Sequence, residues 1–479
     1  MTGLCLAAPP PTAKDIEAVA TASPAILNSH WGAMFLRLQT GEVLFSRNAD
    51  SLFTPASNAK LISTAAVLTQ LGADYRFRTR LLAARGPDGA GVLHGDLVLA
   101  GGGDPTLGAL AVPYRATGHA TDPLAPLAGM VEQAWNAGLR RVEGDIAGDD
   151  TRYSWMPFPE GWAQDDTVFG YGAPVSALTL HDNLFELRVR PTVAGQPPRL
   201  DIDPPLPYFT FDNRAVTVGG AAPGSAPAKL YLDRSPGSRH IQIRGTVAVN
   251  RTRTYELAVD DPAAYAAFAL RELLIRRGIA VTGGSHTHHR PPGQPAEEQP
   301  AVELAARSSP PLIEILEVID KVSHNLWAEM VLREAAHAAA IDDTDPSALT
   351  SAFLGQAGVH DTEYKLVDGS GLSRLSLVSP AALVRLLRHM ASAGKPEPWL
   401  GLLPLAGREG TLENRFRKHA RGRIAAKTGT LSGTGALSGY AFGTDPEDTI
   451  VFSVLVNNAN APASEIRSFI DQMAELFVP

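Results

Sequence analysis

Apolar residues recur at helical spacing in several segments of the chain. The pattern is clearest after Ser57, where Leu61, Ala65 and Leu68 share one face of a helix that ends before Gly72. The same spacing predicts helices over residues 14–27, 57–71, 124–137, 262–277, 311–320, 322–339, 379–393 and 464–477.

Short apolar runs separated by turn residues predict the strands. Residues 31–38 and 43–45 flank Thr40-Gly41-Glu42, which is typical of a hairpin. Residues 184–260 hold only short alternating runs between Gly- and Pro-rich turns, and this predicts a small all-β module. Residues 284–300 are polar and rich in proline, so we expect a connector there. Further strands are expected at residues 97–100, 141–150, 424–427, 437–442 and 450–456.

The two ends of the chain share a mixed α/β pattern that the middle lacks. A length of 479 residues exceeds one ordinary core, so an insertion into a host domain is the economical interpretation. We therefore expect an α/β (α+β) multidomain protein. The predicted parts are a host domain at 1–82 and 303–479, an inserted domain at 83–183 and 261–302, and a nested all-β domain at 184–260.

Composition narrows the classes of function. The net charge of −8 argues against nucleic acid as a partner, because no basic excess is available to neutralise phosphates. No run of about 18 apolar residues occurs, so no transmembrane helix is expected. Cys5 is the only cysteine and excludes an intramolecular disulfide. The apolar start of the chain lacks the basic leader and the full apolar region of an export signal.

Candidate chemistry begins with a serine and a lysine three residues apart, Ser57 and Lys60. On a helix they lie on one face, and the lysine can act as the base for the serine if burial or another cation lowers its pKa. The position of Ser57 at a helix N-terminus leaves backbone N–H groups free to stabilise an oxyanion. This pattern predicts a nucleophilic serine.

Two further motifs follow in order. Ser323 and Asn325 are two residues apart between predicted helices, where a hydroxyl can relay a proton and an amide can hold a peptide. Lys427-Thr-Gly-Thr430 enters a predicted strand. Lys427 offers a cation for a substrate carboxylate, and we expect Gly429 to let an extended substrate approach and pair with the strand.

Similar patterns elsewhere have weaker contexts. Lys395, three residues after Ser392, runs directly into Pro396, and Ser46 with Asn48 belongs to a hairpin. The tract His286-Thr-His-His289 has no matching Cys or acidic ligands in a predicted connector, so we interpret it as a polar loop and expect no metal site. Gly101-Gly-Gly-Asp104 lacks the lysine of a nucleotide loop.

The chain resembles the serine penicillin-binding proteins, specifically the class C low-molecular-mass D-alanyl-D-alanine carboxypeptidase/endopeptidases. The long gap between Ser57 and Ser323 is typical of that class, which carries two extra domains there. The resemblance implies a penicilloyl-serine-transferase (β-lactamase-like) host domain with an antiparallel sheet and helices. The segments that carry it begin at Phe53, Gly101, Gly172, Asp368 and Ala426, and read FTPASNAK, GGGDPT, GAPVSAL, DGSGLSR and AKTGT.

The family also implies roles for the motif residues. Ser57 would be the acylated nucleophile and Lys60 its base. Ser323 would pass a proton to the leaving D-alanine and Asn325 would bind substrate. Lys427 would meet the carboxylate with the help of Thr428, and backbone N–H groups of Ser57 and Thr430 would form the oxyanion hole.

Three further positions each have two interpretations. A carboxylate in the inserted domain of this family can bind the amino group of diaminopimelate, and Asp166 with the neighbouring Tyr171 matches best, although a solvated loop acid is the alternative. His324 departs from the acid or amide that is commoner at its position, and it would add a titration near neutral pH if it faced the cleft. Residues 368–374 either border the cleft or form a structural corner.

We therefore predict a serine-type carboxypeptidase or endopeptidase acting on peptidoglycan stem peptides ending in D-Ala-D-Ala. It would need no cofactor and would be inhibited covalently by β-lactams. Its function places it in the periplasm or cell envelope. A β-lactamase or esterase of the same superfamily, or a non-catalytic muropeptide sensor, is the alternative.

Overall fold

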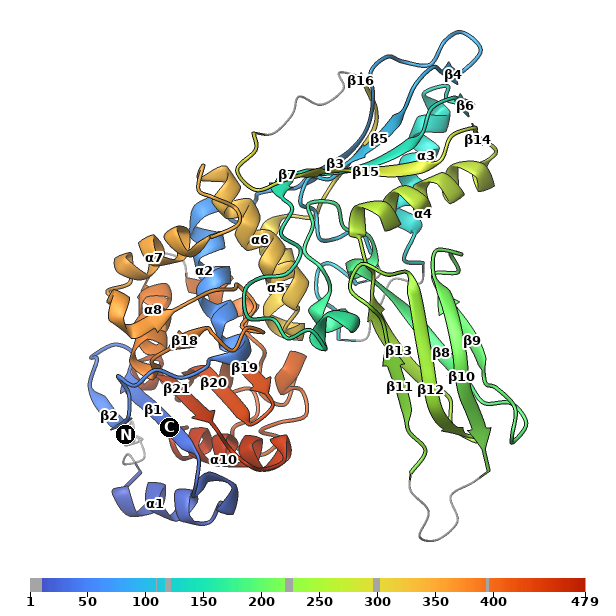
Figure 1. The fold of residues 1–479 in the computed structure, drawn as a ribbon. Helices are drawn as coiled ribbons and strands as arrows, with labels where there is room; N and C mark the ends of the chain where they lie inside the picture. Colours follow the sequence, from blue (N-terminus) through green and yellow to red (C-terminus); the bar gives the residue numbers. More distant parts are fainter. Residues whose placement is uncertain are drawn as a thin grey trace, which may run out of the picture.

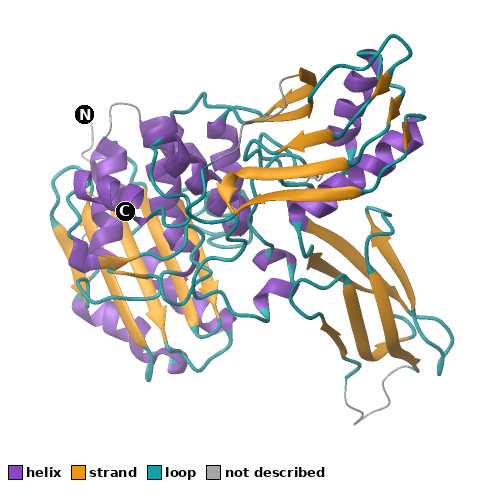
Figure 2. Ribbon diagram, turned by 45° about the horizontal axis from the view of Figure 1, so that its top comes forward, coloured by secondary structure: helices purple, strands orange, loops and turns teal. Residues whose placement is uncertain are grey.

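The fold is seen in a computed structural model, which describes residues 11–108, 110–116, 122–219, 227–295, 302–392 and 396–478. The N-terminal segment with Cys5, and Lys395, lie outside the described residues. Figures 1 and 2 show a helix-flanked sheet, a second α/β part and a β part that extends away from both.

The host region is built on a five-stranded antiparallel sheet in the order β19-β20-β21-β1-β2. Successive side chains of a strand face opposite ways, and here both faces are buried. Phe452 and Val454 of β21 pack toward helix α10, whereas Val451 and Leu455 pack toward the helices around α2. The strands are β1 (His30–Arg37), β2 (Val43–Arg47), β19 (Ile424–Leu431), β20 (Thr434–Ala441) and β21 (Ile450–Asn457).

Helices cover both faces of this sheet (Figure 2). Helices α1 (Ala13–Thr21) and α10 (Ala463–Leu476) contact each other on one face. On the other face α2 packs against α5, α6, α7 and α8. The bounds there are α2 (Ala59–Leu71), α5 (Leu312–Val322), α6 (Asn325–Ala338), α7 (Ser347–Gln356), α8 (Pro380–Ser392) and α9 (Pro396–Leu402).

A second five-stranded sheet, in the order β15-β7-β5-β3-β16, carries helices α3 and α4. A small parallel sheet, β14-β6-β4, belongs to the same part of the chain. The elements of this part are β3 (Arg78–Ala83), β4 (Val92–Leu93), β5 (Leu97–Ala100), α3 (Ala125–Asn136), β6 (Arg141–Val142), β7 (Ile146–Ser154), α4 (Pro262–Arg277), β14 (Ala280–Val281), β15 (Ser285–Arg290) and β16 (Val302–Ser308). A separate pair of short strands, β17 (Tyr364–Lys365) and β18 (Leu377–Val378), lies among the later residues near α8.

Residues 184–258 form two three-stranded sheets, β13-β8-β9 and β10-β12-β11, and no helix of four or more residues lies among the described part of this segment. The prediction of an all-β module is confirmed at the level of its elements. Its strands are β8 (Leu184–Arg190), β9 (Arg199–Asp203), β10 (Thr210–Val218), β11 (Leu230–Asp233), β12 (His240–Ala248) and β13 (Arg253–Ala258).

Two expectations about elements were wrong. The first helix ends at Thr21, and a separate short turn follows from Pro24, because proline at that point cannot continue the hydrogen-bond ladder. Residues 285–290 form strand β15, parallel to β7, rather than a connector loop. The predicted boundaries at 82/83 and 302/303 fall within and at the start of the paired strands β3 and β16, and the division into three domains stays a prediction.

Candidate active site

Ser57 lies in a tight turn, Ala56–Asn58, that leads directly into helix α2. Ala56 has a positive φ of 47°, a strained conformation for a residue with a side chain. Gly371 supports this turn from the other side, since a Cβ at Gly371 would lie 1.8 Å from the Ala56 carbonyl oxygen. The turn therefore holds Ser57 at the start of the helix, as its spacing predicts.

Lys60 is fully buried beneath Ser57. Its Nζ lies 3.0 Å from Ser57 Oγ, and it donates to Asn325 Oδ1 at 2.6 Å and to the Ser370 carbonyl at 2.7 Å. Burial, and then the nearby positive charge of Lys427, hold the pKa of Lys60 well below its ordinary value. A neutral amine at this place can accept the proton of the serine hydroxyl.

Ser323 and Asn325 lie where helix α5 ends and helix α6 begins. Ser323 takes a left-handed conformation with φ of 65°, which turns the chain sharply between the helices. Asn325 contacts both sides of the cleft, because its Nδ2 donates to the Tyr171 carbonyl at 2.8 Å while its Oδ1 accepts from Lys60. The second motif thus joins the base to the segment that carries Tyr171.

Lys427 is also buried, on strand β19, and its Nζ donates to Ser323 Oγ at 2.8 Å. Burial lowers the pKa of Lys427 to about 8, against the opposing charge of Asp320. Asn58 Nδ2 donates to the Lys427 carbonyl at 3.0 Å and ties the strand to the nucleophile turn. The three sequence motifs therefore meet as two serine–lysine pairs.

The rest of the third motif divides between support and cavity. Thr430 lines the cavity. Thr428 instead donates a hydrogen bond from its hydroxyl to Thr411 Oγ1 at 2.9 Å. A Cβ on Gly429 would lie 2.8 Å from the Pro55 carbonyl oxygen. The missing side chain of Gly429 therefore makes room for the turn that carries Ser57, and the approach of a substrate to its backbone stays a prediction.

A cavity of 560 Å³ opens above Ser57. Ser323, Asn325, Asp166 and Tyr171 share its lining with Ser57, so the structure brings Asp166 and Tyr171 to the same cleft as the nucleophile. Tyr171 donates its hydroxyl to Asp166 Oδ1 at 3.0 Å, and burial beside that carboxylate raises its pKa to about 12. Asp166 therefore faces the cleft and accepts a hydrogen bond at its rim.

Residues 368–374 both border the cleft and form a structural corner. Gly371, Leu372 and Arg374 line the cavity. Asp368 organises the turn by accepting from Ser370 Oγ at 2.9 Å, from the Ser373 backbone at 2.9 Å and from Trp162 Nε1 at 3.2 Å. Both interpretations of this segment hold.

Sequence reasoning missed two buried acids and one carbonyl of the site. The Ser370 carbonyl is an acceptor for Lys60, and Glu329 binds the turn that presents it. Asp320 accepts from Thr64 Oγ1 at 3.0 Å, and its other oxygen, Oδ1, has no hydrogen-bond partner among the described residues. Burial raises the pKa of Asp320 and that of Glu329 to about 7.

His324 is half-buried, with 16% of its side chain exposed, and does not line the cavity. Its Nδ1 accepts from the Trp327 backbone at 3.4 Å, which caps helix α6, and its Nε2 lies 3.6 Å from Asp182 Oδ1. Burial and the charge of Lys60 lower its pKa to about 3. His324 therefore stays neutral near neutral pH.

No group of three or more His, Cys, Asp or Glu among the described residues could hold a metal ion. The histidines of the predicted loop lie on β15, where His286 and His288 contact each other at 3.1 Å and His289 lies 2.8 Å from Asp150. None of the helices in the described ranges is long and apolar enough to cross a membrane.

Comparisons with known proteins show the family of the chain. The family described as "D-Ala-D-Ala carboxypeptidase 3 (S13)" matches residues 12–477. The D-alanyl-D-alanine carboxypeptidase of Actinomadura sp. (strain R39) is 36% identical over 465 residues, 94% of this chain and 81% of the relative. The carboxypeptidase DacB of Mycolicibacterium smegmatis is 27% identical over 485 residues, 98% and 85% of the two chains.

The fold has a counterpart among solved structures. Penicillin binding protein 4 (dacB) from Haemophilus influenzae superposes with a TM-score of 0.83 at 21% identity, covering 97% of this chain and 99% of that one. The same protein complexed with a novel β-lactam gives a TM-score of 0.78. At this identity the likeness shows a shared fold.

Proposed function

Because this chain belongs to the D-Ala-D-Ala carboxypeptidase 3 (S13) family, we propose that Ser57 is the nucleophile of its reaction. The predicted family, fold class and enzyme class, a serine-type D-Ala-D-Ala carboxypeptidase of the penicillin-binding class, are confirmed. The observation that carries the proposal is the contact of Ser57 Oγ with Lys60 Nζ, 3.0 Å apart at the floor of the cavity.

Acylation would begin with a proton transfer from Ser57 to Lys60. Neutral Lys60 takes the proton of Ser57 Oγ as that oxygen attacks the carbonyl carbon between the two D-alanines. The backbone N–H groups of Ser57 and Thr430 stabilise the oxyanion. The C–N bond then breaks, and the proton held by Lys60 passes through the Ser323 hydroxyl to the leaving nitrogen, so Lys60 is neutral again and Lys427 keeps its charge throughout.

Deacylation would use the same base. Lys60 takes a proton from water as the water oxygen attacks the acyl carbon, and returns the proton to Ser57 Oγ when the C–O bond breaks. A β-lactam would form the same ester, but its ring amine stays attached to the acyl group and does not leave. This difference supports β-lactams as covalent inhibitors.

The substrate we propose is a peptidoglycan stem peptide ending in D-Ala-D-Ala. Strand β19 is the edge of its sheet, so an extended peptide can add alongside Thr430. The positive charge of Lys427, which donates to Ser323 Oγ, would attract the terminal carboxylate to the part of the cavity that Ser323 lines. Thr428 would assist it. Such a substrate places the enzyme in the periplasm or cell envelope.

Mass spectrometry after penicillin treatment tests the nucleophile. We expect one penicilloyl adduct on the peptide that contains Ser57, and no adduct on Ser57→Ala. Equal labelling of the variant would show that another residue is acylated. Release of the label within seconds would favour a β-lactamase, and an unlabelled wild type that releases no D-alanine from a pentapeptide would favour a sensor.

Asp166 is proposed to bind the amino group of a diaminopimelate side chain, with Tyr171 holding the carboxylate in place. We expect Asp166→Asn to raise KM about tenfold for an amino-bearing stem peptide, the equivalent of one lost charged contact. The same variant should leave KM unchanged for a peptide whose amino group is acetylated. Equal effects on both peptides would remove Asp166 from the recognition of the amine.

A further inference from the structure

Glu329 is a buried carboxylate one helical turn beyond Asn325 on helix α6. Residues four apart lie on the same face of a helix, so both side chains point toward the region beneath Ser57. Only 3% of Glu329 is exposed. It lies outside the cavity above Ser57 and belongs to none of the three sequence motifs.

Both oxygens of Glu329 bind one backbone turn. Oε2 accepts from the Gly369 N–H at 3.1 Å, and Oε1 accepts from the Ser370 N–H at 2.7 Å. The carbonyl of the same Ser370 accepts from Lys60 Nζ at 2.7 Å. A single carboxylate therefore holds the two peptide groups that directly precede the Ser370 carbonyl, and so fixes the turn from which that carbonyl faces the catalytic amine.

The consequence for Lys60 follows from the valence of nitrogen. A neutral amine has two N–H bonds and one lone pair. Lys60 has three close partners, and two of them, Asn325 Oδ1 and the Ser370 carbonyl, can only accept. When those two acceptors take both N–H bonds, the lone pair is left for the third partner, the hydroxyl of Ser57.

We propose that Glu329 is a positioning residue that aims the lone pair of Lys60 at Ser57 by holding the Ser370 carbonyl in place. The proposal rests on the proposed roles of Ser57 and Lys60. Helix α6 then supplies both constraints on the amine, directly through Asn325 and indirectly through Glu329.

The charges around Lys60 support a second effect of Glu329. Burial and Lys427 lower the pKa of Lys60, whereas Asp368, Glu329 and Asp320 raise it. Glu329 is ionised above its own pKa of about 7, so in that range removal of its charge lowers the pKa of Lys60 further and moves the acidic limb of the acylation rate to lower pH. The charged groups nearest Glu329 itself are Asp368, which raises its pKa, and Arg333, which lowers it.

A cavity of 390 Å³ on the far side of the turn makes substitution feasible. Glu329, Arg333 and Asp368 line it together with Thr344 and Ser347. This volume can hold water, which can solvate a shorter or neutral side chain in place of Glu329. We therefore expect Glu329→Gln and Glu329→Asp to fold.

The test is the rate of β-lactam acylation of the full chain as a function of pH. Glu329→Gln can accept only one of the two N–H bonds, and we expect acylation to slow about 100-fold, a cost typical of a misplaced catalytic group, with the acidic limb at lower pH. Glu329→Asp keeps the charge, but its shorter side chain cannot reach both the Gly369 and the Ser370 N–H groups. It should slow acylation while the limb stays in place.

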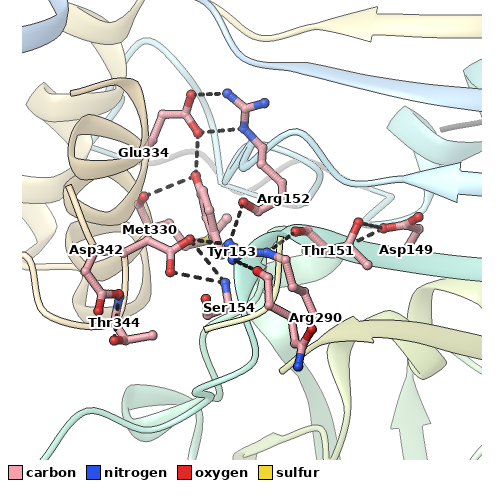
Figure 3. A network of polar contacts seen from close by, with 12 residues as sticks. Asp149, Thr151, Arg152, Tyr153, Ser154, Arg290, Met330, Glu334, Asp342 and Thr344 are labelled. Carbon is pink, nitrogen blue, oxygen red and sulfur yellow. Dashed lines mark hydrogen bonds and ion pairs between the residues drawn. The ribbon is translucent and has the colours of Figure 1, made fainter. Parts of the chain in front are cut away.

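Glu334→Gln is the matched control, because Glu334 is an equally buried glutamate on the same helix that contacts neither Lys60 nor its turn (Figure 3). We expect it to lower the melting temperature without moving the pH limb. Glu329 variants that are acylated at the wild-type rate, or a Glu334→Gln variant that slows equally, would overturn the inference. A wild type without a Ser57 adduct would instead overturn the proposed function.

Discussion

Helix α6 carries two buried glutamates five residues apart, Glu329 near the active site and Glu334 at the far end. The two carboxylates differ in the charged groups that bind them. At the far end Arg152 binds Glu334 through two nitrogens, at 2.8 and 2.5 Å, and the hydroxyl of Tyr153 donates to it as well (Figure 3). The hydroxyl of Tyr75 also donates to Glu334. At the active-site end Glu329 has no arginine or lysine nitrogen within 4.0 Å of its carboxylate in the described part of the chain.

The pKa shifts separate the two ends in the same way. At the far end the pKa of Arg152 is raised, chiefly by its hydrogen bonds to Glu334, so its charge is fixed. At the active-site end burial lowers the pKa of Lys427 to about 8 and raises those of Asp320 and Glu329 to about 7. Fixed charges hold the two regions of the chain together, whereas poised charges allow proton transfer.

Replacing Lys60 by methionine should give the largest effect on this comparison. Methionine keeps the apolar length of the side chain but cannot accept the proton of Ser57. We expect the second-order rate of penicillin acylation to fall about 10⁴-fold, as for the loss of a catalytic base. The free energy of unfolding should not fall, because the substitution removes the cost of burying an amine away from water. An acylation rate within tenfold of the wild type would assign the base to another group.

Arg152→Met tests the opposite end. The variant leaves Glu334 buried without its cation, and we expect a loss of about 2 kcal/mol in the free energy of unfolding. This is below the usual cost of breaking a buried pair, because the arginine is partly exposed. Chemical denaturation measures it, and acylation of the folded variant should stay within twofold. A large fall in acylation would show that the far end also positions the catalytic groups.

Asp320→Asn should move the basic limb of acylation. Asp320 raises the pKa of Lys427 by its charge. Its removal favours the neutral amine, so the limb that reports loss of the Lys427 cation should shift to lower pH. We expect a fall of up to about tenfold in rate at pH 8 and a smaller one at pH 6. Glu317→Gln, on the same helix α5, is the control and should leave the limb unchanged.

Much of the site could be predicted because its geometry is local. Ser57 and Lys60 are three residues apart at the start of one helix, so the helix itself brings them together. To place Lys427, the sequence had only to predict the extended strand on which it lies. Glu329 and Asp320 were missed because an acid in a helical pattern usually faces solvent. The available signal was the spacing of four between Asn325 and Glu329 on a helix that is buried along most of its length.

Strand β15 and Gly429 show what a sequence pattern leaves open. The polar residues 285–290 have no apolar alternation, and their strand exists because the edge of β7 pairs with it in parallel. The sequence did not predict that a side chain at Gly429 would meet Pro55, which lies some 370 residues earlier in the chain. Contacts at such separation depend on how the sheet packs against α2.

The smallest effect is expected for His324→Asn. Asparagine is a good N-cap, so replacing the histidine that caps α6 should change the free energy of unfolding by about 1 kcal/mol or less at pH 7. The pH dependence of acylation should stay the same, because the pKa of His324 is about 3 and the group is neutral throughout. Loss of a limb between pH 6 and 7 in the variant would place His324 among the poised groups.

The pH dependence of the free energy of unfolding is a second measurement on the His324→Asn variant. The pKa of His324 is depressed in the folded state, so the unfolded chain binds its proton first as the pH falls. The wild type should therefore lose stability relative to His324→Asn as pH falls from about 6.5 to about 3. Asp182, beside it, has its pKa raised to about 7 by burial and contributes the opposite slope to both proteins. Denaturation at pH 7, 5 and 4 measures the difference, and parallel curves would show that the histidine is protonated in the fold.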